Sequence, residues 1–354
     1  MPNCSCLIYS SGMNLLALLL AINLTPETPG TQYKQPQMAA LGDTVAVTFG
    51  AGNAVYFASS RDAGRTFSKP VRVAEDGKLA LGRHRGPRVA MTGDAIVISA
   101  VVAEKGGGQD GDLVAWRSTD GGRTWSKGVR VSDVPAAARE GLHGMAAGKG
   151  IVFATWLDLR GQGTRLYGSI SRDGGATWSK NRLVYESPDG RICECCHPSA
   201  KVAGDGKIYV MWRNALGGSR DMYLAVSTDG GETFRSEKLG EGTWPLNACP
   251  MDGGAVALDG SGGVLTVWRR NHSIYLSRPG RPEEEIGMGK DGVVAFGVGG
   301  KIYAAWSGRD GLQLKAPGAD VITRPGAYVD LVTAGKGVVA AWEHDGVIVI
   351  EPLP

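Results

Sequence analysis

The chain has 354 residues, of which 43% are hydrophobic and 21% are charged, and its formal net charge at pH 7 is +3. This near-neutral balance, with no run of like charges, excludes a basic nucleic-acid groove and a polybasic membrane patch. The 54 glycines are about twice the usual share; without a collagen-like period, they indicate many tight turns and therefore many short strands.

The first feature along the chain is an apolar run at residues 15–24, of signal-peptide length and too short to span a bilayer comfortably. We expect residues 1–30 to be an export signal or N-terminal tail, followed by a single domain at residues 31–354. The mature protein is then secreted or periplasmic. No Lys or Arg precedes the run, so Met13 is an alternative start to Met1, and a buried or disordered tail is the alternative to export.

Four octapeptides share the pattern Ser-x-Asp-x-Gly-x-Thr-aromatic, at residues 60–67, 118–125, 171–178 and 227–234. Their Asp residues are 58, 53 and 56 positions apart. In such a turn the carboxylate accepts hydrogen bonds from the local backbone, Gly supplies a positive φ, and the aromatic ring packs into the core. Four copies at near-constant spacing indicate a repeat architecture.

A second repeat consists of apolar or β-branched segments, most of them ending in Trp, at residues 45–49, 96–100, 151–156, 208–212, 264–268, 302–306 and 338–342. Where both repeats occur, the Asp turn follows at a distance that leaves room for one loop and one further strand. Each unit is therefore predicted to contain four antiparallel strands, with the Asp turn between the third and the fourth. Seven such units predict an all-β, seven-bladed β-propeller.

The Asp turns resemble the Asp-boxes, or BNR repeats, of sialidase-like β-propellers, and the resemblance extends over about residues 33–350. It implies the fold, with a six-bladed sialidase ring as the alternative to seven blades. It implies much less about activity, because the Asp-box of that superfamily is a structural turn remote from the catalytic face.

Sialidases of this superfamily share an Arg-Ile-Pro near the first blade and two further arginines that bind the substrate carboxylate. The corresponding stretch here is Gln35-Pro36-Gln37, which has no guanidinium. Arg85, Arg88, Arg213 and Arg269 are present but form no recognisable triad motif. Because bidentate binding of a carboxylate needs the guanidinium fork, we do not expect sialidase activity.

The residues just before the innermost strands are expected to surround one mouth of the central channel, and by alignment of the units they are Gln35, His84, His143, His197, Asp252, Asp291 and Tyr328. Soft ligands gather near these positions. The candidate metal ligands are Cys193, Cys195, Cys196, His197, Cys249, Met251, His84 and His143. Thiolate, imidazole and thioether groups together select copper(I) or zinc.

Three interpretations of the four cysteines remain open. In an exported protein they form two disulfides that join blades four and five, or alternatively they bind copper or zinc with His197. The stretch Cys193-x-x-Cys196-His197 also satisfies the c-type haem attachment pattern, although a haem needs more room than such a loop offers.

Two functional classes follow. The first is an exported propeller that binds a metal, a small ligand or a partner at the channel mouth. The second is a glycoside hydrolase or lyase with a non-sialidase residue set, in which Glu194, Asp252 and Tyr328 are the candidate acids and bases and Arg85 stabilises charge together with His84. A structural scaffold for interactions is a third possibility. We expect glycan, metal or small-molecule ligands, no nucleic acid, and no stable membrane insertion after removal of the signal.

Overall fold

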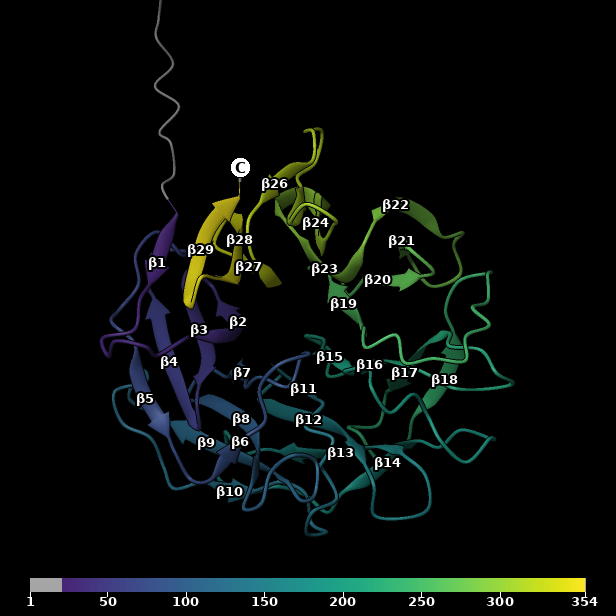
Figure 1. Ribbon diagram of the computed structural model, residues 1–354, viewed down its shortest axis with the longest axis horizontal. Coiled ribbons are helices and arrows are strands. Elements are labelled where there is room, and N and C mark those ends of the chain that lie inside the picture. The colour runs from purple at the N-terminus through teal and green to yellow at the C-terminus, as the bar shows by residue number, and fades with distance from the viewer. Residues whose placement is uncertain (1–20, 354) are drawn as a thin grey trace, which may run out of the picture.

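The computed structural model describes residues 21–353, which form seven antiparallel sheets arranged as blades around a central axis (Figure 1). The described residues contain one short 3-10 turn, Val298–Gly300, and no other helix. This confirms the predicted seven-bladed β-propeller; the six-bladed alternative is not realised. None of the helical structure in residues 21–353 is long and apolar enough to cross a membrane.

In each blade the chain runs from the innermost strand outward. Blade 1 contains β2 (Lys34–Leu41), β3 (Thr44–Ala51), β4 (Ala54–Ser60) and β5 (Val71–Ala74). In blade 2, β7 (Arg88–Met91) and the short β6 (Lys78–Leu79) both pair with β8 (Ile96–Ala103), which is followed by β9 (Asp112–Ser118) and β10 (Val129–Arg130). Blade 3 contains β11 (His143–Gly148), β12 (Ile151–Asp158), β13 (Arg165–Ser171) and β14 (Arg182–Tyr185).

The second half of the ring repeats this order. Blade 4 contains β15 (Ser199–Val202), β16 (Ile208–Arg213), β17 (Met222–Ser227) and β18 (Arg235–Lys238). Blade 5 contains β19 (Gly254–Leu258), β20 (Val264–Arg270), β21 (Ser273–Ser277) and β22 (Glu284–Met288). Blade 6 contains β23 (Lys290–Phe296), β24 (Ile302–Ser307), β25 (Leu312–Lys315) and β26 (Ile322–Arg324).

Blade 7 closes the ring with strands from both ends of the described chain. It contains β27 (Ala327–Ala334), β28 (Gly337–His344), β29 (Val347–Leu353) and β1 (Ile22–Leu24). In the antiparallel pair of β1 and β29, Ile22 lies opposite Ile350 and Leu24 opposite Ile348. The blade thus includes residues that the sequence analysis placed before the domain, and β1 covers an edge that β29 would otherwise leave unpaired.

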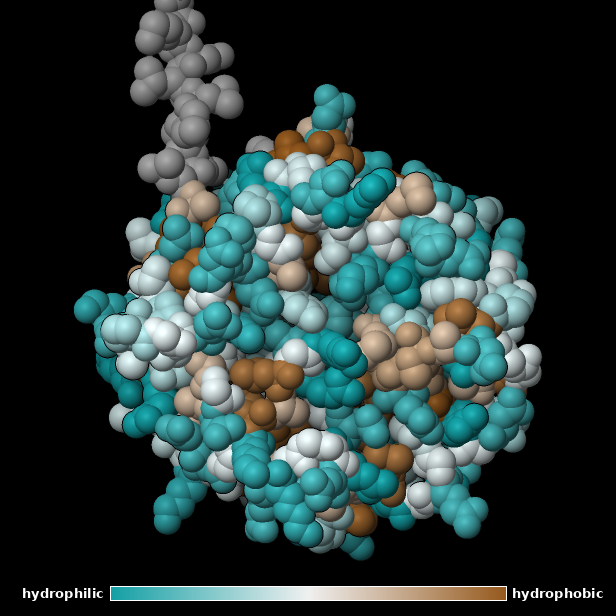
Figure 2. Space-filling view, viewed as in Figure 1, coloured by the Kyte–Doolittle hydropathy of each residue, from teal (hydrophilic) through white to brown (hydrophobic). Residues whose placement is uncertain are grey.

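The core lies between neighbouring blades. The second strand of each blade is the most buried: every residue of β12 and of β16 is buried. Trp212 packs in one cluster with Phe153 and Leu166 of the preceding blade. Figure 2 shows the consequence for the surface: hydrophilic residues predominate on the face in view, and hydrophobic ones form separate patches. The repeated tryptophans therefore hold adjacent blades together.

The Asp turns lie between the third and fourth strands of blades 1 to 4, as predicted. In the first, Asp62 Oδ1 accepts hydrogen bonds from the backbone N–H of Arg65 and Thr66 and from Ser60 Oγ, and the Thr66 hydroxyl donates to Oδ2 at 2.6 Å. The hydrogen bonds from the Thr66 and Ser60 side chains lower the pKa of Asp62 to about 2. Because successive strands alternate in direction, these turns lie at the end of the blades opposite to the start of the innermost strands.

Candidate functional site

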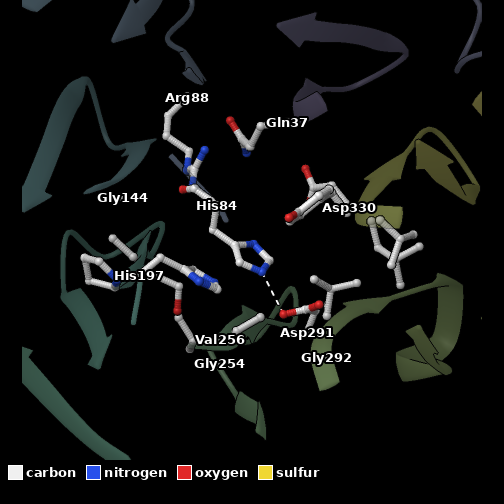
Figure 3. A pocket seen from close by; sticks show the side chains of 18 of the residues that line it. Gln37, His84, Arg88, Gly144, His197, Gly254, Val256, Asp291, Gly292 and Asp330 are labelled. Carbon is white, nitrogen blue, oxygen red and sulfur yellow. Dashed lines mark hydrogen bonds and ion pairs between the residues drawn. The ribbon is translucent and has the colours of Figure 1, made fainter. Parts of the chain in front are cut away.

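A cavity of about 130 Å³ lies on the propeller axis where the innermost strands begin (Figure 3). All seven blades contribute to its wall. The polar and aromatic lining residues that matter below are Gln35, Gln37, His84, Arg88, His197, Asp291, Tyr328 and Asp330. The cavity therefore gathers residues that are remote in sequence, as expected for a propeller channel.

A β-bulge recurs at the start of the innermost strand in blades 1, 6 and 7. The pairing of β2 with β3, of β23 with β24 and of β27 with β28 each shifts by one residue there. The first bulged residue has a positive φ in all three: 56° for Gln35, 58° for Asp291 and 55° for Tyr328. A bulge of this kind re-aims a side chain out of the regular alternation. All three residues line the cavity.

His84 and Asp291 form the central polar pair of the cavity. His84 Nε2 lies 2.7 Å from Asp291 Oδ1, and the side chains are 16% and 7% exposed. The His84 ring also stacks on His197, with 4.2 Å between centroids, and meets the Tyr328 ring edge-on at 5.1 Å. Nδ1 of His84 has no hydrogen-bond partner among the described residues. The pair therefore fixes the imidazole and leaves one ring nitrogen for a ligand.

Two carboxyl groups in the cavity wall have pKa values shifted in opposite directions. Burial alone would raise the pKa of Asp291, but the hydrogen bond and charge of His84 hold it below its ordinary value. Burial raises the pKa of Asp330, although Asp330 Oδ2 accepts the Met38 N–H at 2.7 Å. Figure 3 shows Asp291 joined to the His84 ring, with Asp330 elsewhere in the same cavity wall. The surroundings thus move the two pKa values apart, as in many acid–base pairs.

Arg88 lines the cavity, but both Nη atoms of its guanidinium group already donate hydrogen bonds to backbone carbonyls. Arg88 Nη1 donates to the carbonyls of Gly86 and Pro87, and Nη2 donates to the carbonyl of His84 at 2.7 Å. Burial lowers the pKa of Arg88 to about 10. The main role of Arg88 is therefore to shape the loop that carries His84.

Asp252 lies in a buried group beside the cavity rather than in its wall. It is fully buried, and its Oδ2 is 3.0 Å from Arg269 Nε. Burial and the charge of Asp291 raise the pKa of Asp252 to about 6, against the opposing charges of Arg213 and Arg269. Arg213 is 1% exposed and donates only to the backbone carbonyls of Asp252, Arg220 and Arg269. This group is structural support for the site, out of reach of a ligand in the cavity.

Of the other residues predicted for a hydrolase, one lies in the cavity wall and two lie outside it. Tyr328 lines the cavity, and its hydroxyl accepts the Arg83 N–H at 3.2 Å. Glu194 is exposed and outside the cavity wall. Arg85 donates from Nε to the carbonyl of Glu140 at 2.6 Å. Of the four hydrolase candidates, Tyr328 alone contacts the cavity.

The eight candidate metal ligands do not form a single cluster. His84 and His197 line the cavity. His143 is fully buried, its Nε2 lies 3.1 Å from Ser99 Oγ, and burial lowers its pKa to about 3, so it is a neutral core histidine. Cys249 is exposed, and Met251 lies outside the cavity wall.

Three of the cysteines form a compact group of their own. Cys193, Cys195 and Cys196 have Sγ atoms 3.5 to 3.9 Å apart, and they are the one group among residues 21–353 in which three such ligand atoms lie close together. All four described cysteines are free, so the predicted disulfides between blades four and five are not observed. Cys249 does not join the group because it lies at the surface.

Two further residues of the cavity wall, Asp330 and Gln37, were not predicted as site residues from the sequence. Asp330 lies two residues after Tyr328 on the same strand, and Gln37 two residues after Gln35. The bulge in each strand adds one residue before them, and both Asp330 and Gln37 line the cavity. Gln37 Oε1 accepts the Val89 N–H at 2.6 Å and so ties blade 1 to blade 2.

The fold and cavity define a seven-bladed Asp-box propeller with a polar site at one end of its channel. Residues 50–273 match the model of the BNR repeat-like domain, and the chain belongs to that family. No curated protein matches the sequence.

Solved structures show the same fold at low identity. An α-L-arabinanase of Penicillium chrysogenum, complexed with arabinobiose, is 13% identical over 94% of this chain and 97% of its own, with a TM-score of 0.56. A Hadza microbial sialidase is 17% identical over 87% and 75% of the two chains, with a TM-score of 0.50. A catalytically inactive histidine-to-alanine variant of virginiamycin B lyase from Staphylococcus aureus is 12% identical over 95% and 99%, with a TM-score of 0.56. These proteins share one fold and are named for different reactions, and the likeness of this chain to them extends to the fold alone.

Proposed function

We propose that this propeller is a glycoside hydrolase that removes a terminal neutral sugar at the channel mouth. The observation that carries the proposal is the pair of cavity-lining carboxyl groups, Asp291 and Asp330, whose pKa values are shifted in opposite directions. Glycosidic cleavage needs one carboxylic acid to protonate the leaving oxygen and one carboxylate to act from the opposite side.

The roles follow from the surroundings of each group. Asp330 is half-buried, and its raised pKa makes it the better proton donor of the two carboxyl groups, so we assign it as the general acid. Asp291 is kept ionised by His84 and is the base or nucleophile. His84 holds Asp291 in place, and its free Nδ1 is available to a sugar hydroxyl. Neither role needs the fully buried Asp252.

Two features support a neutral sugar over a sialic acid. Gln35 occupies the place where the sialidases of the superfamily have an arginine, and Arg88 is engaged by backbone carbonyls. Without free guanidinium forks, the cavity has no bidentate partner for a substrate carboxylate. The arabinobiose complexed with the P. chrysogenum arabinanase is a ligand of that neutral kind, on the same fold.

The size of the cavity favours one sugar unit at a chain end. Its volume of about 130 Å³ is below the range of about 300 Å³ and more that is usual for drug-sized ligands. Export of the chain, which the apolar run at residues 15–24 favours, would bring the site to extracellular glycans.

The test is turnover of a panel of neutral aryl glycosides and oligosaccharides by the wild-type chain and three variants. Asp330→Asn and Asp291→Asn are each expected to lower kcat by about 10²- to 10⁴-fold, since each removes one partner of the acid–base pair. Asp345→Asn, which changes an exposed carboxylate in a hairpin outside the cavity, is the matched control and should keep full activity. Full activity in both cavity variants, or no turnover of any member of the panel, would contradict the proposal.

A further inference from the structure

The three-thiol group, Cys193, Cys195 and Cys196, lies in the loop between β14 and β15, beside the cavity but outside its wall. Cys193 and Cys196 are 4% and 1% exposed, and Cys195 is partly exposed. Their Sγ atoms are separated by 3.7 Å (193 to 195), 3.5 Å (193 to 196) and 3.9 Å (195 to 196). The three thiols therefore converge on one point and have one partly open side.

These separations match the edges of a metal–thiolate tetrahedron. With zinc–sulfur bonds of about 2.3 Å and tetrahedral angles, two sulfur atoms bound to one ion lie about 3.8 Å apart. The observed separations of 3.5 to 3.9 Å bracket that value. The group thus has the sulfur spacing of a metal site without any movement of the backbone.

A buried cation lies next to the thiols. Arg213 is 1% exposed, acts electrostatically on Cys196, and donates only to backbone carbonyls. The neighbouring Arg269 pairs with Asp252, and both guanidinium groups lie over the Trp244 ring. A centre with net negative charge beside Arg213 is therefore favoured, and one divalent ion with three thiolates carries one negative charge.

We propose that Cys193, Cys195 and Cys196 bind one thiophilic d¹⁰ metal ion, Zn²⁺ or Cu(I), as a three-thiolate site that is separate from the cavity. Binding displaces the thiol protons and forms three metal–sulfur bonds with no change in oxidation state. The partly exposed side at Cys195 is the route by which the ion enters, and it leaves a coordination position open to a water. Since His197 follows Cys196 directly, the ion also fixes the loop that brings His197 against His84.

The test uses the whole reduced chain, reconstituted without oxygen with Zn²⁺ alone or with Cu(I) alone, followed by elemental analysis and competition with a chelator. We expect about one ion per chain with either metal. Cys195→Ser should weaken metal binding at least 100-fold. Cys249→Ser is the matched control, because Cys249 is exposed and outside the group, and it should bind as the wild type does.

A second measurement covers the case in which Cys195→Ser fails to fold. Substitution of Co²⁺ into the wild-type chain is expected to give the charge-transfer absorption of a cobalt–thiolate centre. Absence of that absorption would overturn the proposal. So would metal binding by Cys195→Ser equal to that of Cys249→Ser, or an isolated native chain in which two of the three sulfur atoms form a disulfide. None of these readouts depends on hydrolase activity.

Discussion

His84 in blade 2 and Asp291 in blade 6 meet across the channel mouth, with 2.7 Å between Nε2 and Oδ1 and 207 residues between them in sequence. Because the two residues belong to blades on opposite sides of the ring, the geometry of the site depends on closure of the whole propeller. The rings of His197 and Tyr328 both contact His84, so the aromatic part of the cavity wall is arranged around this pair.

Loss of the imidazole should raise the pKa of Asp291. In His84→Gln the burial of Asp291 persists while the His84 hydrogen bond and charge are lost, and these hold its pKa below the ordinary value. The acid limb of the pH–activity profile is therefore expected to move to higher pH. An acid limb that stays in place would show that Asp291 is not the ionised group of the reaction.

Asp330 should set the alkaline limb. Because burial raises its pKa, the protonated form persists above the ordinary range of a carboxyl group, and activity is expected to fall as pH rises through that shifted value. In Asp330→Asn, substrates with good leaving groups should retain more activity than natural glycosides, since they need less help from an acid. Equal losses on both substrate types would argue against the acid role.

The Asp turns contribute to stability in a pH-dependent way. The pKa of Asp62 is lowered to about 2 from an ordinary 3.8, so its contribution is complete above about pH 4 and is lost as the pH falls toward 2. Asp62→Asn is expected to lower the free energy of unfolding at pH 7 by about 1 kcal/mol, through the loss of charge-assisted hydrogen bonds that water partly screens.

The measurement is denaturant unfolding of wild type and Asp62→Asn at pH 7 and pH 3. The difference between them should shrink at the lower pH. Asp310→Asn, at an exposed position in a turn without such bonds, is the control. If the difference in the free energy of unfolding were the same at pH 7 and pH 3, the stabilisation would not come from the ionised Asp62 carboxylate.

Strand β1 sets a limit on where the N-terminus can be processed. A chain that begins at residue 21 keeps the pairs of Ile22 with Ile350 and Leu24 with Ile348, whereas one that begins at residue 31 loses them and exposes the edge of β29. The shorter chain is expected to melt at a lower temperature and to aggregate more readily. Equal melting temperatures for the two would show that β1 is dispensable.

Much of the fold was predictable because the repeat is carried by local chemistry: the Ser60–Asp62–Thr66 turn needs no distant partner, and its four copies fix the period. The ring positions His84, His197, Asp291 and Tyr328 were also found by alignment of the blades. His143 was misplaced because β11 pairs with β12 without a bulge, so that its side chain points toward Ser99 of blade 2 instead of the cavity.

What the sequence could not reveal was the register of individual blades. The bulges at Gln35, Asp291 and Tyr328 each add one residue, and one residue turns a side chain to the other face. The bulge at Tyr328 thus sets the direction of the strand residues that follow it, including Asp330 in the cavity wall. The separation of the thiols from the cavity depended likewise on the path of the loop before β15, which no local pattern determines.

The most direct test of the hydrolase proposal is the fate of solvent oxygen during cleavage of a neutral oligosaccharide in water labelled with a heavy oxygen isotope. Mass spectrometry of the released terminal sugar should show one labelled oxygen per bond cleaved by the wild-type chain, and release by Asp330→Asn should be about 10²- to 10⁴-fold slower. An unlabelled product that carries a carbon–carbon double bond would identify an elimination instead, and unchanged release by Asp330→Asn would remove the cavity carboxyl pair from the reaction.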